Sequence, residues 1–193
     1  MKQSYSKIYR IIHWAMAISF ILLLITIFLR LTWMNKNNMA GIIESYLSET
    51  SQVLSQDQLI ILAKQIRAPM WEWHIYIGYF LVGLFCVRFL LPFFGRMKIS
   101  NPFDKRLNTK EKFQKWTYII FYVGVVISLV TGLIIELGPK DFKKPMEEIH
   151  ILSIYYLVPF IVIHLAGVLF AEFTEQKGIV SSIVSGKNEA KQV

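Results

Sequence analysis

Four long apolar segments dominate this sequence and decide what the chain can fold into. They run approximately over residues 8–31, 71–94, 117–137 and 149–172. Each reaches or approaches the roughly 20 apolar residues that an α-helix needs to cross the hydrocarbon of a bilayer. An α-helix also satisfies its own backbone hydrogen bonds, as lipid requires. The segments predict an all-α membrane protein, a four transmembrane helix bundle forming a single domain over residues 1–193.

The composition agrees with a location in the lipid bilayer. Hydrophobic residues make up 54% of the 193-residue chain, and the mean hydropathy is +0.45. The first segment follows Lys2, Lys7 and Arg10, as a signal peptide would follow its basic region. Its apolar run is longer than the 7–15 residues of a signal peptide, and no small-residue cleavage site follows it. We therefore expect a retained helix.

The formal net charge of +8 is distributed unevenly between the two sides of the predicted bundle. The N-terminal tail, the link 95–116 and the C-terminal tail hold roughly twice as many basic residues as the other two links, which predicts cytoplasmic termini by the positive-inside rule. The basic residues of the cytoplasmic side are Lys2, Lys7, Arg10, Arg96, Lys98, Lys105, Arg106, Lys110, Lys112, Lys115, Lys177, Lys187 and Lys191. No nucleic-acid-binding motif accompanies them, so we expect no nucleic acid partner.

The links carry their own local signals. Residues 33–70 form the longest one, and Ser55 and Gln58 match a capping box ahead of a helical apolar pattern. We expect a short helix there, lying at the outer membrane surface and ended by Ala68–Pro69. Asn101–Pro102 predicts a turn in the cytoplasmic link, and Gly138–Pro139 opens a short link over residues 138–148.

All four histidines of the chain lie inside the apolar segments, where ionisable residues are rare and mark functional sites. His150 and His164 are fourteen residues apart. In a continuous helix this spacing returns to within about 40° of the same face after a rise of roughly 21 Å. The two imidazoles are therefore expected to face the bundle interior near opposite edges of the hydrocarbon.

Depth in the membrane predicts the partners of these histidines. His13 and His164 lie nearer the cytoplasmic ends of their segments, whereas His74 and His150 begin theirs on the external side. The level-matched couples are His13 with His164 and His74 with His150. Two imidazoles that face each other inside a helix bundle are the axial ligands of a b-type haem that transfers electrons. Two couples predict two haems b, with irons about 20 Å apart.

Two readings without haem remain at this point. Histidines inside a bundle can be ordinary core residues that form hydrogen bonds, as in a scaffold subunit. They can also line the pathway of a metal or proton transporter, which would require carboxylates in mid-membrane. The centres of the four segments contain none. The single cysteine, Cys86, excludes an iron–sulfur cluster and a CxxCH haem attachment.

Two arginines are candidates for binding the haem propionates. Arg88 follows His74 by fourteen residues and shares its helix face, and Arg10 precedes His13 by one turn. Both also fit as charges at the cytoplasmic membrane surface. Gly124 and Gly132 lie in the third segment, where small residues let a flat ring or another helix approach the backbone.

Side chains near the segment ends have ordinary explanations. The five tryptophans, including Trp71, fit the interfacial belts of a membrane protein. Glu136 and Glu172 could relay protons, but carboxylates at such positions are more often solvated. Pro159 predicts a bend in the fourth segment.

The motifs RIIHWAMA (10–17), HIYIGY (74–79) with Arg88, and the His150–His164 spacing ahead of EQKGIVSSIVSGK resemble the bacterial cytochrome b561 family. That family includes the cytochrome b subunits of nickel–iron hydrogenases. The resemblance implies two haems b, with His13 and His164 binding the inner one and His74 and His150 the outer one. It also implies a bacterial inner-membrane protein that exchanges electrons with a quinone.

The resemblance implies two kinds of electron-transfer role. Some members are similar to a superoxide oxidase, which passes electrons from external superoxide to quinone, and others anchor a larger oxidoreductase such as a hydrogenase. The long external loop, residues 33–70, departs from compact members. It would cover the surface where an external donor approaches, and it leaves room for a partner redox protein.

Overall fold

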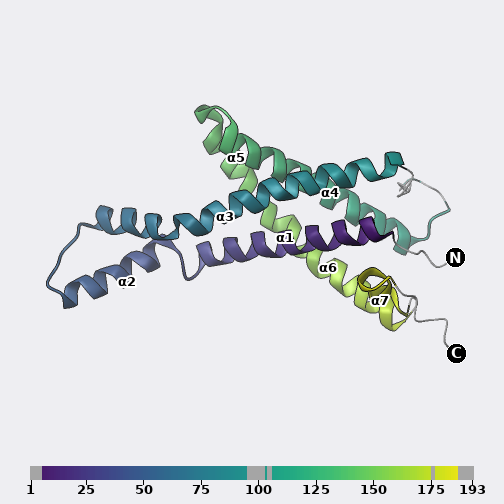
Figure 1. Ribbon diagram of the computed structural model, residues 1–193, viewed down its shortest axis with the longest axis horizontal. Helices are drawn as coiled ribbons and strands as arrows, with labels where there is room; N and C mark the ends of the chain where they lie inside the picture. The colour runs from purple at the N-terminus through teal and green to yellow at the C-terminus, as the bar shows by residue number, and fades with distance from the viewer. Residues whose placement is uncertain (1–5, 95–102, 104–105, 175–176, 187–193) are drawn as a thin grey trace. The chain divides into compact units, whose positions relative to one another are not determined.

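The computed structural model describes residues 6–94, 103, 106–174 and 177–186, and every regular element in these ranges is a helix. Four helical stretches, Lys7–Leu31, Gln56–Phe93, Thr109–Leu137 and Lys140–Phe173, are long and apolar enough to cross a membrane. The predicted all-α class with four spans is confirmed. The expected turn at Asn101–Pro102 lies outside the described residues. Figure 1 labels the helices along the chain.

The chain divides into two units, which are described in turn. One unit comprises Ile12–Arg88, and the other comprises Met1–Ile11 together with Phe89–Val193. The first unit contains most of α1 (Lys7–Leu31), all of α2 (Lys36–Glu49) and most of α3 (Gln56–Leu90). The second contains η1 (Leu91–Phe94), α4 (Thr109–Leu137), α5 (Lys140–Ile151), α6 (Ser153–Phe173) and α7 (Ile179–Val184).

Residues 33–70 hold more helix than the sequence indicated, because α2 was not foreseen. The side chain of Asn35 caps α2 by accepting a 3.0 Å hydrogen bond from the backbone N–H of Asn37. A turn that includes Ser51, with φ of 57°, leads to α3. The capping box is confirmed: the Ser55 N–H donates to Gln58 Oε1 at 2.9 Å, and the Gln58 N–H donates to Ser55 Oγ at 3.3 Å.

The two helices of this loop pack through a small core of their own. Ala40 of α2 lies against Leu59 and Ala63 of α3, and these three residues are at most 3% exposed. Partly buried residues surround them, namely Met39, Ile43, Leu47, Leu54 and Ile60. Alanines at the contact allow a close approach of the helices, so α2 and the first turns of α3 form a helical hairpin. We call residues 35–66 the external hairpin, after the side of the membrane predicted for them.

The expected end of the loop helix at Ala68–Pro69 is wrong. Helix α3 continues through Pro69 as one helix of 35 residues, about 50 Å long at 1.5 Å per residue. This exceeds the hydrocarbon thickness of about 30 Å. The segment ahead of Trp71 is thus a continuation of the second span, and it projects beyond the hydrocarbon instead of forming a separate surface helix. Proline is tolerated in such helices, with a local loss of one backbone hydrogen bond.

Two expectations for the last third of the chain also need correction. The link 138–148 is largely helical, because α5 begins at Lys140, directly after Gly138–Pro139. The fourth span consists of α5 and α6, which meet at Leu152, whose N–H donates to the Ile149 carbonyl at 3.1 Å in a tighter, three-residue turn. His150 and His164 therefore lie on two consecutive helices. Pro159 lies inside α6 without ending it.

Aromatic packing joins α4 to α6 in the second unit. Phe121 stacks on Phe160, with ring centroids 3.7 Å apart and an interplanar angle of 13°. The Tyr156 hydroxyl hydrogen-bonds Ser128 at 2.8 Å, and the Tyr156 ring lies so close to Gly124 that a Cβ there would come within 2.9 Å of it. Glycine at position 124 therefore sets the distance between these two helices.

We predict that Leu59→Ala opens the external hairpin. Leu59 is 1% exposed, and truncating a buried leucine typically costs about 2–5 kcal/mol. Hydrogen exchange of the α2 backbone amides should accelerate by more than about tenfold, since 1.4 kcal/mol corresponds to a factor of ten. Ile61→Ala is the matched control, because Ile61 is 55% exposed. Equal exchange rates in the two variants would contradict this packing.

Candidate functional site

In the unit Ile12–Arg88, His74 is held on α3 by a threonine of α1. The Oγ1 of Thr26 lies 2.7 Å from His74 Nδ1 and also donates a 2.6 Å hydrogen bond to the Leu23 carbonyl. The Trp71 ring stacks on the imidazole at 4.6 Å with an interplanar angle of 3°. The Arg30 guanidinium lies 4.0 Å from the centre of the Trp71 ring. The imidazole is thus fixed both in its plane and at one nitrogen.

His13 is the second histidine of this unit and lies toward the other end of α1. It is half-buried and meets the ring of Trp14 edge-on at 5.9 Å. Thirteen residues of the same helix separate it from Thr26, a rise of about 20 Å. Because Thr26 contacts His74, the unit presents its two histidines at two levels, as the sequence predicted.

In the other unit, His150 of α5 is held by a threonine of α4. Thr131 Oγ1 lies 3.1 Å from His150 Nδ1, and it also donates to the carbonyls of Ile127 at 2.8 Å and Ser128 at 3.1 Å. The neighbouring Gly132 faces the same ring, since a Cβ at this position would lie 3.2 Å from His150 Cε1. Thr131 and Gly132 of α4 therefore pack closely against this imidazole.

His164 of α6 is held by a tyrosine near the other end of α4. The hydroxyl of Tyr118 lies 3.1 Å from His164 Nδ1, and the Phe160 ring stacks on the imidazole at 5.7 Å with an angle of 12°. Tyr118 and Thr131 are thirteen residues apart on α4, again a rise of about 20 Å. The histidines of this unit are also separated into two levels.

The structure places the two candidate arginines differently. Arg88 is half-buried in the last turn of α3, which is one continuous helix from His74, so the fourteen-residue spacing keeps the two residues on nearly one face. Arg10 donates from Nη1 to the Val184 carbonyl at the end of α7, at 3.3 Å. Its Nε is buried, and no hydrogen-bond partner for this atom lies among the described residues.

Glu172 has a structural role that the sequence did not reveal. Its carboxylate accepts hydrogen bonds from the backbone N–H groups of Gly178 and Val180, both at 2.9 Å. Gly178 adopts φ of 87°, which favours glycine. The carboxylate joins α6 to the start of α7, while Arg10 holds the end of α7. Both charged side chains therefore fasten the C-terminal helix to the spans.

Sequence reasoning found the histidines but missed the groups that hold them. Thr26, Tyr118 and Thr131 are the missed residues, and Trp71 was assigned only to an interfacial belt. Their signal was a hydroxyl inside an apolar segment, which is too common to single out a site. The couples His13–His164 and His74–His150 each take one residue from either unit, so the pairing stays a prediction.

We predict that Glu172→Ala loosens α7. The change removes the acceptor of two backbone donors at the start of α7. Hydrogen exchange at the amides of Gly178 and Val180 should therefore accelerate, because both N–H groups lose their hydrogen-bond acceptor. Glu136→Ala, at an exposed carboxylate in the last turns of α4, should leave both amides unchanged. Unaltered exchange in Glu172→Ala would show that the carboxylate does not hold the helix.

Comparison with known proteins assigns the chain to a family. The family model described as prokaryotic cytochrome b561 matches residues 4–186, nearly the whole chain. No curated protein and no solved structure matches it significantly. The match agrees with the four helices able to cross a membrane and with the predicted resemblance. The chain therefore belongs to the prokaryotic cytochrome b561 family and is a multi-pass bacterial membrane protein that transfers electrons through haem b.

Proposed function

We propose that this protein is a dihaem oxidoreductase that moves electrons across the bacterial inner membrane between a quinone and an external redox partner. His13 and His164 would bind one haem b, and His74 and His150 the other. The observation that carries the proposal is the two-level arrangement within each unit. Thirteen residues separate His13 from Thr26 on α1, and thirteen separate Tyr118 from Thr131 on α4.

The side chains present fit the demands of haem. For three of the four imidazoles a hydroxyl lies at hydrogen-bond distance from Nδ1, which supports Nε2 as the nitrogen that would bind iron. Gly132 leaves space beside His150 that a Cβ would fill. The buried Nε of Arg10 is a donor suited to a propionate, and Arg88 is the second candidate. When bound, the haems supply reversible one-electron chemistry, and two imidazoles on each iron exclude small ligands.

The distribution of basic residues supports the orientation that we propose. Both termini and the link 95–116 would lie in the cytoplasm, and the external hairpin would lie on the opposite side of the inner membrane. His74 and His150 would then bind the outer haem. A quinone is the proposed partner within the lipid bilayer because it is lipid-soluble and accepts electrons one at a time.

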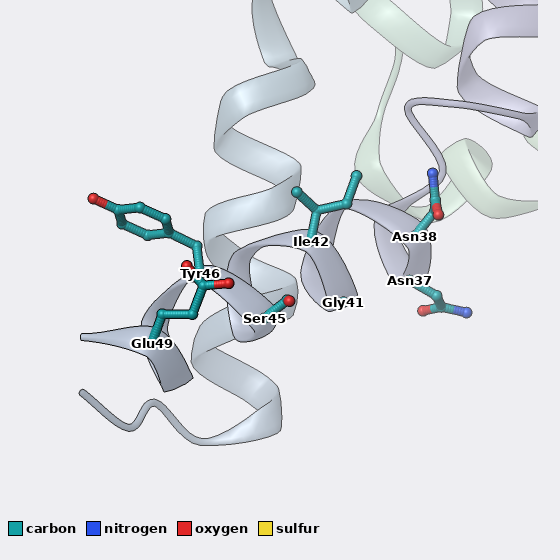
Figure 2. A pocket seen from close by; sticks show the side chains of 7 residues that line it. All are labelled: Asn37, Asn38, Gly41, Ile42, Ser45, Tyr46 and Glu49. Carbon is teal, nitrogen blue, oxygen red and sulfur yellow. The ribbon is translucent and has the colours of Figure 1, made fainter. Parts of the chain in front are cut away.

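A second candidate role is that of the cytochrome b anchor of a larger oxidoreductase, such as a hydrogenase. The external hairpin favours it, because this loop has its own buried core and projects beyond the span. One side of α2 carries a shallow hollow of about 510 Å³ among polar and apolar side chains that include Asn38, Ile42 and Tyr46 (Figure 2). A folded hairpin fits a docking partner protein better than it fits entry of superoxide.

We predict that His164→Ala removes one of two haems. A pyridine haemochrome assay with a measured protein concentration should give two haems per chain in the native protein and one in the variant. Leu165→Ala, at a residue 56% exposed on the same helix, should retain both. A native protein without haem would contradict the function, and a His164→Ala protein with two haems would contradict this ligand assignment.

Double variants test the pairing of the histidines. His13→Ala combined with His164→Ala should still hold one haem, because both changes affect the same site. His164→Ala combined with His74→Ala should hold none, because each change removes a ligand of a different haem. The reverse result would show that the couples are crossed.

We predict that Gly132→Val selectively empties the site of His150. A Cβ at position 132 would lie 3.2 Å from the imidazole, and the two methyl groups of valine would displace the ring from Thr131. One haem per chain should remain. Gly83→Val is the control, because a Cβ at Gly83 meets nothing within 4 Å. Two haems bound to the Gly132→Val protein would show that close packing at Gly132 is not needed to hold His150.

A further inference from the structure

The hydrogen bonds of Thr26 favour one tautomer of His74. A threonine hydroxyl has one hydrogen to donate. Thr26 donates it to the Leu23 carbonyl at 2.6 Å, which is an obligate acceptor. When the hydrogen points to Leu23, the hydroxyl oxygen acts as an acceptor toward His74 Nδ1, at 2.7 Å. In this arrangement the neutral imidazole of His74 holds its hydrogen on Nδ1 and its lone pair on Nε2.

The same reasoning applies independently to His150. The carbonyls of Ile127 and Ser128, at 2.8 and 3.1 Å, share the one hydrogen of the Thr131 hydroxyl, and the oxygen lies 3.1 Å from His150 Nδ1. His150 also hydrogen-bonds the backbone of Ser128, so Thr131 acts there beside a second partner. The two threonines lie on different helices, and in both the hydroxyl hydrogen-bonds a backbone carbonyl of its own helix. Both are buried, Thr26 at 7% and Thr131 at 5% exposure, so water does not readily replace either of them.

These contacts also affect the electronic character of the imidazoles. A hydroxyl that donates to a carbonyl becomes a better acceptor, because hydrogen bonds in a chain polarise one another. A strong acceptor at Nδ1–H places more negative charge on the ring and strengthens Nε2 as a metal ligand. More negative charge on an axial ligand stabilises ferric iron relative to ferrous iron and lowers the reduction potential.

We propose that Thr26 and Thr131 are positioning residues that lock His74 and His150 in the Nδ1–H tautomer and lower the reduction potential of the haem they share. The proposal rests on the ligand assignment of the proposed function. The proposal predicts a different effect at the other haem, proposed to lie between His13 and His164. There the hydroxyl beside His164 Nδ1 belongs to Tyr118. A phenol oxygen is a weaker acceptor than the aliphatic hydroxyl of a threonine, so the same effect is smaller there.

The test is a redox titration of the full-length, haem-loaded protein followed by its visible absorption. In the double variant Thr26→Val and Thr131→Val, one of the two one-electron waves should shift to higher potential. A tenfold change in the reduction equilibrium is expected, which corresponds to 59 mV for one electron. The wave of the other haem should stay in place. The electron paramagnetic resonance signal of the affected ferric haem should shift as its axial imidazoles change.

Matched variants separate the loss of the acceptor from other effects of valine. Thr32→Val and Thr117→Val each remove a hydroxyl that donates to a backbone carbonyl, of Phe28 and Phe113 respectively, and should leave both waves unchanged. Thr26→Ser and Thr131→Ser keep the hydroxyl and should restore the native potential. Loss of one haem in the valine pair, with retention in the serine pair, would also support the proposal.

Two results would overturn the inference, and both differ from a failure of the proposed function. Unmoved waves in the valine pair with two haems bound would show that the threonines do not influence the haem. A shift of equal size in the serine pair would show that the hydroxyl is not the cause. If His74→Ala and His150→Ala each retain two haems, the ligand assignment itself is wrong.

Discussion

An imidazole inside an apolar segment must have its polar nitrogens satisfied, and this requirement organises the structure. Three of the four histidines meet it at Nδ1 through a hydroxyl from a neighbouring helix: Thr26, Thr131 or Tyr118. The hydroxyl contacts join α1 to α3, and α4 to the stretch formed by α5 and α6. The residues that orient the candidate ligands therefore also hold the helices in register.

In each unit, one helix carries side chains of the candidate sites at two membrane levels. Helix α1 carries His13 at one level and Thr26 at the other, and α4 carries Tyr118 and Thr131. The common interval of thirteen residues corresponds to about 20 Å. This distance suits two cofactors within one bilayer. The break at Leu152 does not disturb the arrangement, because α4 supplies the contacts to both His150 and His164.

The parts outside the spans are built by different means. The external hairpin is held by apolar packing of Ala40 against Leu59 and Ala63, as expected for helices exposed to water. At the other end of the chain, a carboxylate and a guanidinium hold α7: Glu172 caps its start and Arg10 binds its last carbonyl. Arg10 was expected beside a haem, and its buried Nε keeps that prediction open.

The amino-acid sequence by itself determined the four spans, the helical class, the family and the positions of the four histidines. These features depend on the length of apolar runs and on spacing along one helix, which are local properties. Only the tertiary structure decided which hydroxyl meets which imidazole, because that choice depends on packing between helices far apart in the chain. It also decided that α3 continues through Pro69 and that Glu172 accepts two backbone N–H groups, since neighbouring contacts override the local signals of proline and of an end-of-helix carboxylate.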